Sequence, residues 1–110
     1  MNALEQRWQQ VTQTSQAIRR QLEAGAQNTD EAERLLQDRD ALLRDLLSES
    51  FLSLLGPEEL SWLQAQVESF MREDTRLRDA LSTEQQRIQN QLKQDNNKAK
   101  AAKAYQQGRS

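Results

Sequence analysis

The sequence contains no cysteine and no histidine. Without cysteine it can form neither a disulfide framework nor a thiolate metal site. Without histidine it lacks the most common general base and the most common transition-metal ligand. The three glycines do not form a phosphate-binding loop. These absences argue against an enzyme, so we expect no catalytic residue, no metal site and no cofactor.

Proline occurs once, and aromatic residues make up 5% of the 110 residues. The apolar residues are mostly leucine and alanine, a composition that favours helices over strands. No apolar run approaches the ~18 residues that a membrane-spanning helix needs. The N-terminus lacks the basic region and apolar run of a signal peptide. We therefore expect a small all-α protein in the cytoplasm, without membrane contact.

Charge is distributed unevenly along the chain. Residues 1–92 contain ten arginines and sixteen acidic residues, a net charge of −6, whereas residues 93–110 have a net charge of +4. The four lysines all lie in this last segment, at Lys93, Lys98, Lys100 and Lys103. A basic tail can neutralise phosphates, but the acidic body carries no recognisable DNA- or RNA-binding motif. We therefore expect no nucleic-acid partner, and the tail is electrostatically complementary to the body.

The first half of the sequence contains two amphipathic patterns. The first predicts a helix over about 2–24 that stops at Gly25, with seam positions at Leu4, Trp8, Val11, Ser15, Ile18 and Leu22. The polar Ser15 marks either a weak point or the close approach of a neighbouring helix. The second pattern starts at Thr29 or Asp30 and predicts a leucine-striped helix that ends near residue 48. The stretch SESFLSLLG then either extends that helix or forms a packed turn that holds Phe51.

A third, longer pattern follows the Gly-Pro-Glu-Glu boundary at residues 56–59, a typical helix start. It predicts a helix over about 57–94, with seam positions at Leu63, Val67, Phe70, Asp74, Leu77, Leu81, Glu84, Ile88 and Leu92. The helix should weaken at QDNN, because Asp and Asn are poor helix formers. The fold class is then an antiparallel three-helix bundle over 1–94, with a short basic C-terminal helix or tail over 95–110.

Two charged residues, Asp74 and Glu84, lie on the seam of the third helix. We favour the interpretation that they mark breaks in burial and reach water; the alternative is that they set the register by pairing with arginines such as Arg39 or those of a partner. Trp62 lies one residue from the seam. Packing against Phe51 is its favoured role, and an exposed anchor for a partner is the alternative.

Helix lengths leave part of the third helix uncovered. At ~1.5 Å per residue it is roughly 55 Å long, against about 35 Å for the first helix and about 28 Å for the second. Leu81, Ile88 and Leu92 are expected on this overhang, and an uncovered apolar stripe usually marks an interface. The basic tail could cover it through Ala101, Ala102 and Tyr105. A solvated tail and a contact with a second copy are the other interpretations.

Three stretches of the sequence resemble the FliT family of flagellar export chaperones. DEAERLLQDRDALLRDLL is similar to the family's second helix, FMREDTRLRDALSTEQQRIQNQLKQ to its third, and KAKAAKAY to its short C-terminal helix. The resemblance implies an α-helical cytoplasmic chaperone that binds the filament-cap protein FliD and delivers it to the type III export apparatus, including the flagellar export ATPase. It also implies, in some bacteria, binding of a flagellar transcription regulator.

The resemblance further implies a regulatory lid over 98–107. The lid would carry Ala101, Ala102 and Tyr105 and cover part of a partner-binding surface made of Leu36, Leu43, Leu77, Leu81, Ile88 and Leu92. Here the tail is short and strongly basic. Two other functions remain open: a structural homodimeric coiled coil, and a chaperone of the hook–filament junction proteins.

Overall fold

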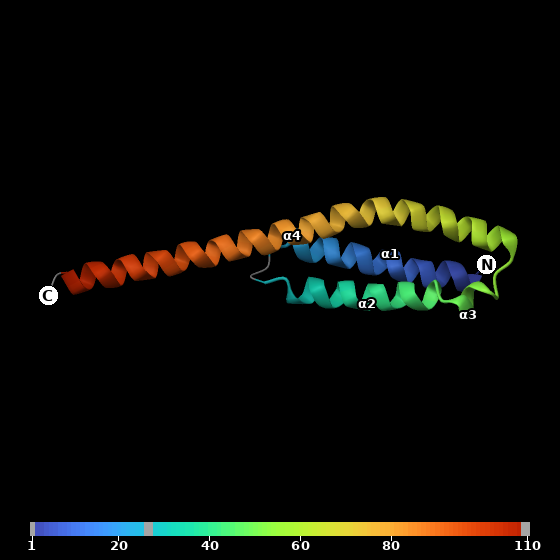
Figure 1. Cartoon of the computed structure of the whole chain (residues 1–110), viewed down its shortest axis with the longest axis horizontal. Helices are drawn as coiled ribbons and strands as arrows, with labels where there is room; N and C mark the ends of the chain where they lie inside the picture. The colour runs from blue at the N-terminus through green and yellow to red at the C-terminus, as the bar shows by residue number, and fades with distance from the viewer. Residues whose placement is uncertain (1, 26–27, 109–110) are drawn as a thin grey trace.

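The computed structural model describes residues 2–25 and 28–108, with side chains over 3–25 and 28–103. Within these described residues, four helices follow one another: α1 (Asn2–Glu23), α2 (Asp30–Leu46), α3 (Glu49–Leu52) and α4 (Pro57–Gly108). In Figure 1, α1, α2 and the first part of α4 lie side by side, with α2 antiparallel to the other two, and α4 then continues alone as a projecting arm. All elements of the described residues are helical, so the prediction of an all-α fold is confirmed.

The molecule is a rod rather than a sphere. Its Cα radius of gyration is 21.3 Å and it measures 79 × 20 × 20 Å. A compact domain of this length would have a radius of gyration of about 13 Å. The difference follows from the length of α4, which contains 52 residues.

Local sequence sets the ends of the first two helices. After α1, Gly25 has a φ of 66°, which a residue without a Cβ adopts at little cost. At the start of α2, the Asn28 side-chain oxygen accepts a hydrogen bond from the backbone N–H of Asp30 at 3.1 Å, whereas Thr29 makes no side-chain cap bond. Acidic residues then fill the first turn of α2, where the helix dipole favours them.

The SESFLSLLG stretch forms a packed turn and does not extend α2. Ser48 caps the short helix α3 by accepting a hydrogen bond from the backbone N–H of Phe51 at 3.3 Å. Phe51 and Trp62 are both half-buried against the same apolar cluster, so Trp62 contributes to the core, whereas its direct packing against Phe51 stays a prediction. The corner therefore redirects the chain into α4, which begins at Pro57 as predicted.

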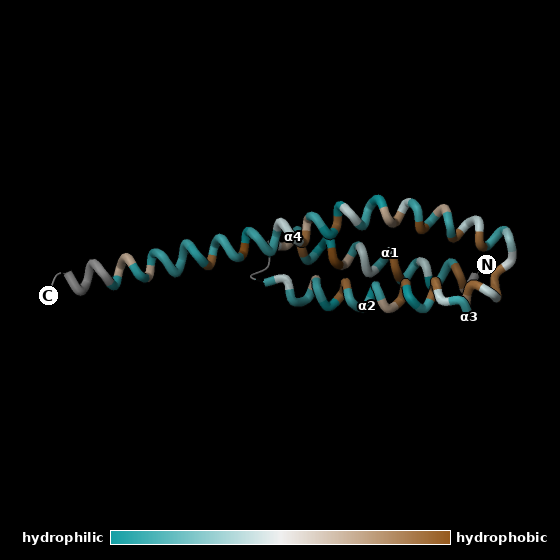
Figure 2. The backbone as a smooth tube through the Cα atoms, in the orientation of Figure 1, coloured by the Kyte–Doolittle hydropathy of each residue, from teal (hydrophilic) through white to brown (hydrophobic). Residues whose placement is uncertain are grey.

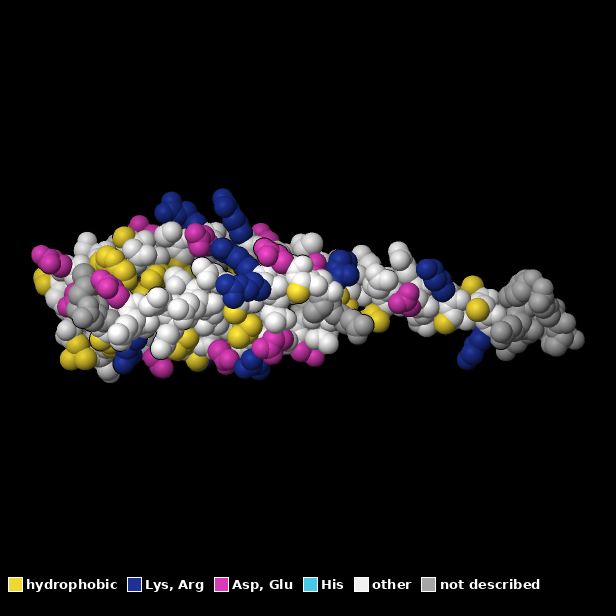
Figure 3. All heavy atoms as spheres, turned by 180° about the vertical axis from the view of Figure 1, so that it is seen from behind, with side chains coloured by type: hydrophobic (Ala, Val, Ile, Leu, Met, Phe, Trp, Pro, Cys, Tyr) yellow, Lys and Arg dark blue, Asp and Glu magenta, His cyan; other side chains and the backbone are white. Residues whose placement is uncertain are grey.

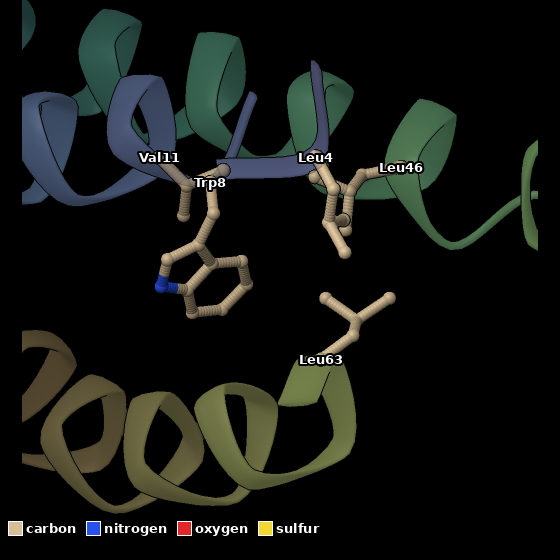
Figure 4. Packing of buried hydrophobic residues seen from close by; sticks show 5 residues of the cluster. All are labelled: Leu4, Trp8, Val11, Leu46 and Leu63. Carbon is tan, nitrogen blue, oxygen red and sulfur yellow. The ribbon is translucent and has the colours of Figure 1, made fainter. Parts of the chain in front are cut away.

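The core consists of two apolar clusters. The proximal cluster lies near the α3 corner and contains five buried residues, Leu4, Trp8, Val11, Leu46 and Leu63, which Figure 4 shows facing one another across the helices. The distal cluster contains Ile18, Ala32, Leu77 and Leu81. In Figure 2 the apolar positions alternate with polar ones along the packed helices, while the projecting arm is mostly hydrophilic.

The C-terminal segment does not form a separate helix. α4 passes through residues 95–97 without a break and ends at Gly108, so the expected interruption at QDNN is absent. The propensity cost of Asp and Asn is below about 0.7 kcal/mol per residue. The lysine- and alanine-rich segment that follows consists of good helix formers, and extending an existing helix needs no new nucleus.

Candidate functional site

The six predicted partner-binding residues lie in three different places. Leu77 and Leu81 are buried, with 5% and 8% of their surface exposed, and belong to the distal cluster. Leu36 packs against the distal cluster and Leu43 against the proximal one, both half-buried. Ile88 is half-buried and Leu92 is 63% exposed on the arm. Only the last two belong to the uncovered part of α4.

The expectation that Leu81 lies on the overhang is therefore wrong. The start of α2 reaches the level of Leu81, where Ala32 belongs to the same cluster. One turn further along α4, the side-chain amide of Gln85 donates a hydrogen bond to Glu33 at 2.6 Å. The overhang starts beyond this contact. Helix lengths alone could not show it, because the offset between helices along the rod depends on the connecting turns.

The arm presents a short apolar stripe followed by a basic segment. Every side chain described over 89–103 is exposed. Ile88 and Leu92 are spaced by four residues and therefore share one face of the helix. Figure 3 shows scattered apolar and basic side chains along this narrow arm. The stripe is open to a partner at Leu92 and partly covered at Ile88.

The predicted lid residues continue the arm. Ala101 and Ala102 are exposed, and Tyr105 lies outside the residues whose side chains are described. Because α4 is unbroken to Gly108, the segment 98–107 points away from the bundle in this structure. The lid therefore stays a prediction, and seating it would require α4 to bend.

A second exposed apolar area lies at the opposite end of the rod. Leu54 in the corner after α3 is 78% exposed, and Leu47 and Leu60 are 42% and 41% exposed. This area was not predicted from the sequence. The sequence feature that indicates this exposed area is the loss of helical periodicity in SESFLSLLG, because consecutive apolar residues cannot all face one core.

A polar layer crosses the bundle between the two clusters. Arg39 of α2 is completely buried and donates hydrogen bonds to Ser15 of α1, at 3.1 Å, and to Asp74 of α4. Its guanidinium also lies 4.7 Å from the ring centre of Phe70. The Nε of Arg39 has no hydrogen-bond partner among the described residues. Asp74 therefore pairs with Arg39 across helices, and the favoured interpretation that its charge simply reaches water is wrong.

The layer extends to the surface through Arg78. The Nε of Arg78 donates to Asp74 at 2.8 Å, and its Nη2 donates to Asp40 at 3.3 Å. Burial alone would raise the pKa of Asp74, but the hydrogen bonds from Arg78 and Arg39 outweigh it and hold that pKa below its usual value. The hydrogen bond to Asp74 likewise raises the pKa of Arg78. The other seam charge, Glu84, accepts hydrogen bonds from Arg87 on its own helix.

This lowered pKa predicts an acid-sensitive contribution to stability. A carboxylate whose folded pKa is depressed stabilises the protein fully above its unfolded pKa of about 3.9, and loses that stabilisation as the pH falls through the folded pKa. Urea unfolding at pH 5, 4 and 3 should show a steeper decline in unfolding free energy for the unsubstituted protein than for Asp74→Asn. Asp79→Asn, an exposed position on the same helix, should keep the steep decline. Equal slopes for all three proteins would contradict the prediction.

The surface between α1 and α4 is hollowed on both sides of one ion pair. Arg19 of α1 and Glu73 of α4 approach to 3.4 Å, and both are largely exposed. Cavities of about 330 and 430 Å³ adjoin this pair. Within the described residues no group of three or more acidic side chains is arranged to hold a metal ion. Nothing in these depressions resembles a nucleophile with its base.

The comparisons with known proteins decide the family. The model of the family described as flagellar protein FliT matches residues 5–107. The chain belongs to the FliT family. No curated protein and no solved structure matched the chain.

Membership of the FliT family indicates the general function of this protein. FliT proteins are flagellar export chaperones and not enzymes. The match covers the sequence of the helical bundle and of almost the whole arm. No helix in the described ranges 2–25 and 28–108 is long and apolar enough to cross a membrane.

Proposed function

We propose that this FliT-family protein binds the C-terminal segment of the filament-cap protein FliD in the cytoplasm and keeps it competent for export. Family membership supports a flagellar client. The observation that carries the proposal is the stripe of the half-buried Ile88 and the exposed Leu92, which continues the packed bundle along the arm. A chaperone needs such an apolar surface, available to a client and too small to drive aggregation.

The stripe favours a helical client segment. An amphipathic helix can lie along α4 with its apolar face on Ile88 and Leu92, in the manner of other helix-in-groove complexes. Each side chain would contribute about 1.5–3 kcal/mol if fully buried by the client. The half-buried Leu36 on α2 belongs to the neighbouring distal cluster and could extend the contact.

The C-terminal segment is proposed to regulate this contact. Residues 98–107 would fold back so that Ala101, Ala102 and Tyr105 cover the stripe. The bend would fall at residues 95–97, where Asp and two Asn residues lower helix propensity. The opposite charges of tail and body favour the folded-back state. Because a short docked helix gains little more than it loses in ordering entropy, a client could displace it.

Removing the tail tests client binding and the lid together. We would titrate the full chain, and a chain that ends at Gln94, with the C-terminal segment of FliD. If the lid competes with the client, the shortened chain should bind several-fold more tightly, and Tyr105→Ala should change affinity in the same direction. The shortened chain keeps both apolar clusters, because their residues all precede Gln94.

The outcomes of this titration separate the two parts of the proposal. If the two chains bind the client with equal affinity, the chaperone function is supported and the lid is contradicted. No binding by either chain would refute the FliD client and favour the hook–filament junction proteins, which the same titration can use as clients. Contacts with the flagellar export ATPase and with a flagellar transcription regulator are further proposals that follow from the family.

The exposed arm also supports a second candidate, a homodimer in which two arms pair as a coiled coil. The observation in its favour is that Leu92 is 63% exposed at a seam position. Sedimentation at low protein concentration distinguishes the candidates, because a constitutive coiled coil stays dimeric and a client-binding monomer does not.

A further inference from the structure

The polar layer lies at the same level on all three long helices. On each helix, a polar residue separates the apolar residues of the proximal cluster from those of the distal cluster: Ser15 lies between Val11 and Ile18, Arg39 between Leu43 and Leu36, and Asp74 between Phe70 and Leu77. The layer therefore interrupts the apolar core across the whole width of the bundle. Side chains on its two sides belong to different clusters.

The two clusters hold α4 unequally. In the proximal cluster, α4 contributes the buried Leu63 and the half-buried Trp62, Val67 and Phe70, and the α3 corner closes the end. In the distal cluster, α4 contributes only Leu77 and Leu81. Beyond them, the side-chain amide of Gln85 donates a hydrogen bond to Glu33 of α2. A long helix can curve away from such a surface while its backbone hydrogen bonds lengthen only slightly.

We propose that Ser15, Arg39 and Asp74 form a latch that divides the bundle into two units. The distal half of α4 opens from the α1–α2 hairpin when the latch is released, while the proximal cluster stays closed. Arg39 is suited to this role because its buried charge depends on Asp74 from the moving helix and on Ser15 from the fixed hairpin. Breaking this buried pair is the costly step of the opening, because the contacts from Arg78 to Asp40 and from Gln85 to Glu33 are exposed or only partly buried.

This opening explains how Leu77 and Leu81 could reach a client. Both are buried in the closed state, and both would become continuous with Ile88 and Leu92 along α4. This consequence rests on the proposed function. The latch itself does not, and the experiment below contains no client.

Thiol labelling can test the latch, because the chain has no cysteine of its own. Val11→Cys and Ile18→Cys form a matched pair: both positions are on α1, both are fully buried, and they lie on opposite sides of Ser15. A small thiol-specific reagent should label position 18 at least tenfold faster than position 11. The rate at position 18 should also depend less steeply on urea concentration, because a partial opening exposes less surface than global unfolding.

Second substitutions then separate a latch from a general loss of stability. Asp74→Asn should speed labelling at position 18 at least tenfold. The substitution weakens the latch in the closed state and leaves the open state, in which the latch is already broken, unchanged. Leu63→Ala, which removes a buried side chain from the proximal cluster, should speed labelling at position 11 at least tenfold. Leu63→Ala should change the labelling rate at position 18 by less than twofold, because the proximal cluster stays intact during distal opening.

A cooperative bundle without a latch gives a different pattern. In that case Leu63→Ala would accelerate labelling at both positions by the same factor, and the two urea dependences would coincide. Either result overturns the proposal. If circular dichroism shows that Ile18→Cys does not fold, Ala32→Cys on α2 serves as the distal probe, because Ala32 is 2% exposed in the same cluster.

Discussion

Asp74→Ala should lower the free energy of unfolding by about 3–5 kcal/mol, because it leaves the buried guanidinium of Arg39 without its carboxylate. Arg39 is completely buried, so solvent cannot replace the lost partner in the folded state. Its Nε already lacks a hydrogen-bond partner among the described residues. The carboxylate of Asp40 lies 3.8 Å from Nη2, which is beyond hydrogen-bond distance, so it does not replace Asp74 as an acceptor. Urea unfolding monitored by circular dichroism at neutral pH measures the change.

Two further variants define what the Asp74→Ala result means. Asp79→Ala changes an exposed acidic residue on α4 and should stay within about 0.5 kcal/mol of the unsubstituted protein. The double substitution Arg39→Met with Asp74→Leu removes both charges and should restore most of the stability, because apolar residues can replace a buried pair. If Asp74→Ala lowers the free energy of unfolding by less than about 1 kcal/mol, the Arg39–Asp74 pair does not contribute the stability that its burial implies.

Ile88→Asp combined with Leu92→Asp should weaken binding of the FliD C-terminal segment at least 100-fold. The two side chains form the apolar stripe of the arm. Losing two contacts of about 1.5–3 kcal/mol each corresponds to a factor of 100 or more in the dissociation constant. The free energy of unfolding should change little, since neither residue belongs to the buried set of either cluster. Isothermal titration measures the affinity.

The matched control adds the same charges to another face of the same turns. Gln86→Asp with Asn90→Asp has the same four-residue spacing, and both positions are exposed. This variant should bind the client within a few-fold of the unsubstituted protein. Equal weakening by both double variants would indicate a charge effect instead of a stripe. If the Ile88→Asp/Leu92→Asp variant binds the client with unchanged affinity, the client does not bind at the stripe. The exposed corner around Leu54 would then be tested next.

Periodicity in the sequence was sufficient to predict which residues of α1 face the core, but on α2 it missed the buried Ala32 and Arg39. The positions Leu4, Trp8, Val11 and Ile18 on α1 are all buried, as their spacing indicates. The start of α4 at Pro57 was equally clear, because proline and the following glutamates suit a helix N-terminus. The weaker expectation concerned the end of α4. Helix propensity at residues 95–97 gives a small energetic penalty, and the flanking sequence decides whether the helix stops.

The sequence alone thus determined an all-α chain, its helical seams and its asymmetric charge. The tertiary structure decided which residues of different helices meet. Spacing along one helix does not show which helix it packs against or how far the two helices are offset along the rod. That offset buries Leu77 and Leu81, leaves Leu92 exposed, and brings Ser15, Arg39 and Asp74 to one level. A charged residue on an apolar seam therefore became interpretable only once its neighbours in space were known.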